Sequence, residues 1–206
     1  MKKSHWYNYL WIWSVVYFTM GFFHILFAWL GLISFFLPLV FAVGFGNKGF
    51  CNRYCDRGQL LRALGNQKGF SRRKDVPDWM RSKAFRYGFL AFFMAMFMNM
   101  LYMTYRVYAG TAEIQETVTL FWSIPVPWGF AYAGGAEPWV AQFAFGFYSM
   151  MLTSAILGIL TMLLYKPRSW CVYCPMGTMT QLICKMKAGK KKMLLYEGIA
   201  LLMLKL

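Results

Sequence analysis

Long stretches without a charged residue constrain this chain most. From Ser4 to Asn47 the sequence contains no Lys, Arg, Asp or Glu, and further uncharged runs extend from Tyr87 to Tyr105 and from Pro138 to Tyr165. About 20 apolar residues are enough to cross the hydrocarbon layer of a membrane as a helix. Only 14% of the residues are charged, against roughly a quarter in soluble domains. We therefore expect an integral membrane protein.

The first uncharged run is too long for one helix. Its 44 residues would extend to about 66 Å at ~1.5 Å per residue, whereas the hydrocarbon core is ~30 Å thick. Two spans fit this run better, Tyr7–Ala28 and Leu32–Gly46, with a turn near Gly31. The second span is expected to bend, because Pro38 removes a backbone donor. With the two later runs, the sequence predicts an all-α protein of four transmembrane helices.

The basic residues predict the orientation. Of the 22 Lys and Arg, eleven lie between Lys48 and Arg86 and eight between Lys166 and Lys205, whereas the segment Val107–Glu137 holds three of the seven acids. Under the positive-inside rule, both termini and both basic segments face the cytoplasm. We expect the cytoplasmic membrane of a bacterium or archaeon. The net charge of +15 then reflects topology and contact with anionic lipid rather than binding to nucleic acid.

Four of the five cysteines lie in two similar sequence motifs, GFCNRYCDRGQLL at residues 49–61 and SWCVYCPMGTMTQL at residues 169–182. In each, an aromatic residue precedes two cysteines, and a glycine follows the second cysteine by three residues. Each pair comes directly after an apolar run. The pairs are Cys51 with Cys55, and Cys171 with Cys174.

Because each motif follows a pair of expected spans, the single membrane domain, residues 1–206, is expected to consist of two weakly repeated halves. Residues 1–80 would hold the first helix pair, its cysteine turn and a cytoplasmic loop, and residues 81–206 the second pair, its turn and a basic tail. A short surface helix is expected after each turn, the first with Leu60, Leu61 and Leu64 on one side. A repeat of this kind indicates a pseudo-symmetric site between the halves.

Three chemistries use cysteine pairs at this spacing. Four thiolates are the usual complement of an iron–sulfur cluster, and a proline after the last cysteine matches bacterial cluster-binding runs. The basic residues Arg53, Arg57 and Lys185 would offset the negative charge of such a cluster. A quinone-linked thiol–disulfide oxidoreductase would cycle Cys171 and Cys174, although thiols on the cytoplasmic side are kept reduced. A structural zinc would also be closed by four cysteines, as in an assembly subunit.

Two other residues have reactive side chains in apolar surroundings. Cys184, ten residues beyond Cys174, is expected to be a buried cysteine rather than a ligand. His24 lies within the first expected span, where an ionisable residue is a functional candidate. A hydrogen bond to quinone would be one role for His24, and a contact between helices is the alternative. The only other histidine, His5, lies at the membrane edge.

Spans followed by Cys-x₃-Cys or Cys-x₂-Cys-Pro turns resemble the polyferredoxin-like membrane iron–sulfur proteins, which are associated with electron supply to periplasmic nitrate and nitrous-oxide reductases. Family members usually have a proline after both turns, whereas Asp56 follows Cys55 here. The chain holds no counterpart of the family's soluble two-cluster ferredoxin module. The resemblance implies a membrane subunit that relays single electrons to another subunit.

Together these observations predict one [4Fe–4S] cluster with Cys51, Cys55, Cys171 and Cys174 bound to its irons. The chain would be an electron-transfer subunit of an oxidoreductase complex, without catalytic residues of its own. Its expected partners are ferredoxin-like, flavin or haem proteins and the membrane lipid.

Overall fold

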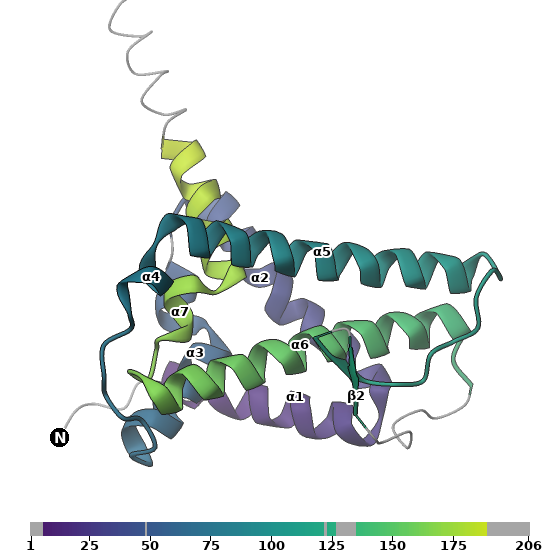
Figure 1. Ribbon diagram of the computed structural model, residues 1–206, viewed down its shortest axis with the longest axis horizontal. Coiled ribbons are helices and arrows are strands. Elements are labelled where there is room, and N and C mark those ends of the chain that lie inside the picture. Colours follow the sequence, from purple (N-terminus) through teal and green to yellow (C-terminus); the bar gives the residue numbers. More distant parts are fainter. Residues whose placement is uncertain (1–5, 48, 122, 127–134, 189–206) are drawn as a thin grey trace, which may run out of the picture.

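The computed structural model describes residues 6–47, 49–121, 123–126 and 135–188 (Figure 1). His5 and most of the expected basic tail lie outside these residues. The described chain is mostly helical. Its α-helices are α1 (Trp11–Phe23), α2 (Gly31–Phe45), α3 (Asp56–Arg62), α4 (Asp78–Arg81), α5 (Lys83–Tyr108), α6 (Pro138–Leu164), α7 (Trp170–Tyr173) and a helix over residues 175–188. Tighter or wider helical turns form η1 (Trp6–Tyr9), η2 (Ile25–Leu30), η3 (Phe50–Tyr54) and η4 (Ala63–Gln67), and β1 (Thr119–Leu120) pairs antiparallel with β2 (Ile124–Pro125).

Three of the described helices are long and apolar enough to cross a membrane. They cover Ile25–Phe45, Lys83–Tyr108 and Pro138–Leu164. This length and composition are compatible with an integral membrane protein. Helix α1, with 13 residues, is shorter than the roughly 20 residues that one crossing needs, so the expected four crossings do not follow from helix length alone.

Helix α6 occupies the centre of the bundle and contributes fourteen buried residues. Figure 1 shows α5 on one side of α6 and α1 on the other. Glycines allow both approaches: a Cβ atom at Gly146 would lie 2.5 Å from Met100 of α5, and one at Gly21 of α1 would lie 2.5 Å from the Tyr148 ring. The Tyr148 hydroxyl also donates to the Phe18 carbonyl oxygen over 2.9 Å, which fixes α1 against α6.

The expected turn near Gly31 is wrong, because the first apolar run breaks at His24. His24 has an extended backbone (φ −147°, ψ 111°), and its Nδ1 accepts a hydrogen bond from the Leu26 N–H over 3.4 Å. The chain then continues through η2 into α2 without a second break. Gly31 serves packing instead, since a Cβ there would lie 2.7 Å from the Tyr17 hydroxyl and 2.8 Å from Phe147.

The short helix after the first cysteine turn was expected to lie on the surface, and this expectation is also wrong. Helix α3 packs against α1 and α6, and Gly58, Gln59 and Leu61 are buried. Leu61 belongs to an apolar cluster that includes Met162 of α6 and Trp170 and Tyr173 of α7. The two cysteine turns therefore sit on one shared core at this end of the bundle.

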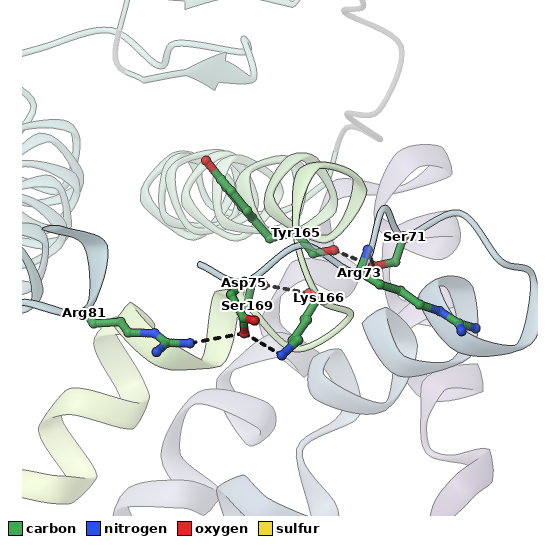
Figure 2. Close-up of polar contacts among 7 residues, drawn as sticks. All are labelled: Ser71, Arg73, Asp75, Arg81, Tyr165, Lys166 and Ser169. Carbon is green, nitrogen blue, oxygen red and sulfur yellow. Dashed lines mark hydrogen bonds and ion pairs between the residues drawn. The ribbon is translucent and has the colours of Figure 1, made fainter. Parts of the chain in front are cut away.

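The connecting loop, residues 68–77, is tied to the end of α6 by polar contacts (Figure 2). Ser71 Oγ donates to the Tyr165 carbonyl oxygen, and Asp75 accepts a hydrogen bond from Lys166. Arg81 lies 3.6 Å from the same Asp75 carboxylate. These contacts hold the loop beside the segment that leads into the second cysteine turn.

Candidate functional site

The first cysteine turn is a wide helical turn. Helix α2 ends at Gly46, whose left-handed backbone (φ 63°) suits glycine. The turn η3 closes where the Cys55 N–H donates to the Phe50 carbonyl oxygen over 3.0 Å, a bond that spans five residues. Cys55 then adopts an extended conformation and caps α3, with Sγ accepting from the Gly58 N–H over 3.4 Å.

The second cysteine turn has the same plan with one residue fewer. Here the Cys174 N–H donates to the Trp170 carbonyl oxygen over 2.9 Å, a bond that spans four residues. Cys174 also leaves the helical conformation (φ −49°, ψ 128°), and its carbonyl oxygen accepts from the Thr178 N–H over 2.9 Å as the next helix begins. The π-type turn therefore absorbs the extra residue of Cys-x₃-Cys, so both turns run from an aromatic residue to a cap-forming cysteine.

The two turns enclose one cavity of about 180 Å³. We call it the thiol cavity, because all four paired cysteines line it. The remaining lining residues come from α2, η3, α3, α6, α7 and the segments that flank α7: Ser34, Phe35, Pro38, Phe50, Asn52, Asp56, Arg57, Met151, Arg168, Trp170, Met176 and Gly177. Cys184 lies on the helix over residues 175–188 and does not line the cavity.

Burial and neighbouring groups affect the thiols of Cys55 and Cys174, which line the thiol cavity. None of the chain's five cysteines forms a disulfide. Burial raises the pKa of the Cys55 thiol well above its usual range, and Asp56, Cys171 and Cys174 raise it further. Burial likewise raises the pKa of Cys174 to about 11. Metal ligation must remove these protons, so we expect metal affinity to increase with pH.

Two arginines and one carboxylate also reach the thiol cavity. Arg57 donates to Ser154 Oγ and Met151 Sδ of α6 and lies 5.9 Å from the centre of the Phe18 ring. Arg168 donates to two carbonyl oxygens of the first turn. The Asp56 carboxylate accepts from Ser14 Oγ over 2.8 Å and from Ser34 Oγ over 3.4 Å.

The sequence located only part of this electrostatic environment. Arg57 lines the thiol cavity as expected for a charge-compensating residue, but Arg53 and Lys185 do not. Arg168 and Asp56 were missed as site residues. Their positions, three residues before Cys171 and directly after Cys55, were the signals that could have identified them.

His24 lies away from the cysteines. It ends α1, whereas the thiol cavity adjoins Asp56, whose carboxylate contacts Ser14 near the start of α1. The His24 side chain caps η2 through Leu26 and meets the Phe27 ring edge to face, with 5.8 Å between ring centres. This local contact accounts for the side chain, and it gives no support to a quinone contact.

A family model described as a 4Fe-4S binding domain matches residues 27–74 and 149–193. Each matched segment contains one cysteine pair, and the two segments together cover a little under half of the chain. This is an iron–sulfur protein. The match confirms the expected [4Fe–4S] cofactor and supports a role in electron transfer. No curated protein and no solved structure matches the chain.

The residues around the thiol cavity fit such a cluster. Four sulfur donors surround one space, and each iron of a cubane takes one thiolate. In the described residues, no group of three or more Cys, His, Asp or Glu side chains is close enough together to hold a single metal ion. Gly58 lies close to the site, because a Cβ there would lie 3.3 Å from Arg168 Nη2 and 3.6 Å from Cys55 Sγ, whereas a Cβ at Gly177 would make only ordinary contacts, the nearest 3.7 Å from the Cys171 carbonyl oxygen.

Proposed function

We propose that this iron–sulfur protein is a membrane-embedded electron-transfer subunit whose single cluster is held by Cys51, Cys55, Cys171 and Cys174. The observation that carries the proposal is the convergence of both cysteine pairs on one cavity. Bound there, a [4Fe–4S] cluster supplies one-electron chemistry. The protein's residues supply four thiolates, two nearby guanidinium groups and an apolar core beneath the turns.

The exposure of one ligand indicates where electrons would enter or leave. Cys171 is exposed, whereas Cys51, Cys55 and Cys174 are partly buried. A cluster at one end of the bundle cannot alone carry an electron across ~30 Å of hydrocarbon. We therefore propose that a redox partner with a ferredoxin-like, flavin or haem centre docks over the Cys171 end, within a larger complex.

We further propose four membrane crossings, with the cysteine turns on the cytoplasmic face of a bacterial or archaeal membrane. Helix α1 alone is about 20 Å long at ~1.5 Å per residue. However, η1 extends it, and the Trp6 ring lies 5.7 Å from the Tyr54 ring, beside Cys55. The other end of α1 reaches His24 and η2, where Trp29 Nε1 donates to the Val140 carbonyl oxygen near the start of α6. We propose that the segment Trp6–Phe23 and η2 together complete this first crossing.

The matching turns support the pseudo-repeat. Both second cysteines have a non-helical backbone and precede a helix, and in both turns a glycine follows three residues later. The family model also matches once around each pair. We propose that residues 1–80 and 81–206 descend from one duplicated unit, and that the first half shortened its first helix.

Neither alternative chemistry gains support from the site. A dithiol that exchanges with disulfides needs a readily formed thiolate, whereas burial raises the pKa of both Cys55 and Cys174. A structural zinc ion requires four sulfur atoms close together around one centre. Among the described residues, no group of three or more such ligands is that close together.

Metal and sulfide analysis tests the function most directly. The purified protein is expected to contain about four irons and about four acid-labile sulfides per chain, as the cubane requires, and to give an electron paramagnetic resonance signal after dithionite reduction. Cys51→Ser, Cys55→Ser, Cys171→Ser and Cys174→Ser should each lower the iron content severalfold and lower stability, because cluster binding is coupled to folding. Cys184→Ser is the matched control and should retain iron and signal. A protein that holds zinc without iron, or a Cys51→Ser/Cys55→Ser double variant that keeps the cluster, would contradict the proposal.

A further inference from the structure

Arg168 differs from the other residues that line the thiol cavity because one of its donors is buried without a partner. Its Nη1 donates to the Asn52 carbonyl oxygen over 3.2 Å, and its Nη2 donates to the Cys51 carbonyl oxygen over 3.1 Å. Its Nε atom is buried and has no hydrogen-bond partner. A buried donor without an acceptor costs free energy, and more so when the group is charged.

The unpartnered Arg168 donor belongs to a residue of the thiol cavity. Three buried side-chain polar atoms lack a partner in the part of the chain that the structure describes: Tyr17 Oη, Arg86 Nε and Arg168 Nε. Of these three residues, only Arg168 lines the thiol cavity. Arg168 precedes α7 and donates hydrogen bonds to the backbone of η3. Its guanidinium group therefore connects the two cysteine turns. Because Arg168 lines the cavity between the turns, a group bound in that cavity is the acceptor that we consider for Nε.

Arg168 forms no ion pair among the described residues, although Asp56 lines the same cavity. Among the described residues, the carboxylate that forms ion pairs is that of Asp75, and its partners are Arg81 and Lys166 rather than Arg57 or Arg168. A cluster with four thiolate ligands is negatively charged, and reduction adds one further negative charge. Hydrogen bonds to sulfur and nearby charges are among the factors that set the potential of such a cluster.

We propose that Arg168 is a positioning residue that donates a hydrogen bond from Nε to a sulfur atom of the cluster or of its thiolate ligands and thereby raises the reduction potential. The inference rests on the proposed function, because it requires the cluster in the thiol cavity. Arg57 has a different role: its side chain contacts Ser154, Met151 and the Phe18 ring, so it would act on the cavity through its charge. Lysine can replace that charge, but it cannot reproduce the planar fork of Arg168, whose two Nη atoms donate to the first turn while Nε has no protein partner.

A potentiometric titration of the purified full-length protein, followed by electron paramagnetic resonance, tests this inference. Arg168→Lys keeps the charge and removes Nε. One-electron reduction of its cluster is expected to become about tenfold less favourable, which corresponds to a potential about 59 mV lower. Arg168→Gln should shift at least as far, because it loses the charge as well. Arg86→Lys removes an equally buried, unpartnered Nε away from the cavity, and it should titrate like the wild type.

A wild-type potential in Arg168→Lys would overturn the inference. If neither Arg168 variant assembles a cluster, the wild-type protein labelled with ¹⁵N-arginine decides the question. Pulsed electron paramagnetic resonance of its reduced cluster should show coupling to an arginine nitrogen, and that coupling should persist in Arg57→Lys. Absence of the coupling would also overturn the inference. A wild-type protein without any cluster signal would instead contradict the proposed function itself.

Discussion

Asp75 illustrates how much of the arrangement around the turns depends on single side chains. It joins the connecting loop to Lys166, at the end of α6, and to Arg81 in α4. The hydrogen bond from Lys166 is the main reason that the pKa of Asp75 lies below its usual value of about 3.9. Because Asp75 is fully exposed, we expect a local effect that salt weakens rather than a large contribution to global stability.

Asp75→Asn should therefore loosen the connecting loop without releasing the cluster. At neutral pH, trypsin is expected to cleave after Arg72, Arg73 or Lys74 severalfold faster in this variant than in the wild type, with iron content unchanged. Asp78→Asn, in the first turn of α4, is the control and should be cleaved at the wild-type rate.

The same contact predicts a pH dependence of the wild-type loop. The pKa of Asp75 is lower in the folded protein, so the stabilisation is complete at pH values above about 4 and is lost as pH falls through the folded-state pKa. Hydrogen exchange of the loop amides, corrected for intrinsic rates, should show less protection below pH 4 in the wild type. Asp75→Asn should show no such transition, and an identical transition in both proteins would assign it to another group.

At the scale of helices and turns, composition located three long apolar helices because each needs an uncharged run of membrane-spanning length. Composition could not locate the break in the first run. Gly31 was assigned to a turn, but glycine also permits close helix packing, and here it meets Tyr17 and Phe147. The break occurs at His24, where a side chain replaces a lost backbone bond, and this effect depends on geometry rather than on hydropathy.

Two glycines in one helix test this interpretation. Gly31→Ala should destabilise the protein by roughly 1–3 kcal/mol, because its Cβ overlaps Tyr17 and Phe147. Gly44→Ala places a Cβ where no atom lies within 4 Å, and it should be neutral or stabilising by up to about 1 kcal/mol from helix propensity. Thermal unfolding in detergent measures both variants, and equal midpoints would show that Gly31 does not pack as described.

The cysteine turns make a second prediction at this scale. Deleting Asn52 converts Cys-Asn-Arg-Tyr-Cys into Cys-Arg-Tyr-Cys, which matches the second pair, Cys-Val-Tyr-Cys. Because η3 absorbs the extra residue as a wide turn, the shortened turn should close as α7 does and keep most of the iron. Deleting Val172 leaves too few residues for one helical turn, and the cluster should be lost. Iron analysis compares the two, and loss of iron in both would show that the two turns are not interchangeable.

At the scale of the whole molecule, the sequence predicted the cofactor because four cysteines in two similar motifs imply a four-thiolate centre. The family match confirms the [4Fe–4S] cofactor. The assignment of each cysteine to an iron remains a prediction. The polar surroundings could not be foreseen in the same way. Ser14, Asp56 and Ser154 meet the site only because α1, α3 and α6 pack together, and single-sequence patterns do not encode which helix faces meet.

The number of crossings gives the last prediction: if the three long helices all cross, both cysteine turns lie on one side whether or not α1 crosses. Only the N-terminus distinguishes three crossings from four. The contact of Trp6 with Tyr54 brings the first described residues beside Cys55, so an N-terminal reporter should read cytoplasmic, as should a fusion after Arg73, with a fusion after Glu116 reading external. The basic residues that flank the turns predict that this shared side is the cytoplasmic one. An external N-terminus would show that α1 does not cross, and opposite readings for Arg73 and a fusion after Lys192 would separate the cysteine pairs and exclude a shared cluster.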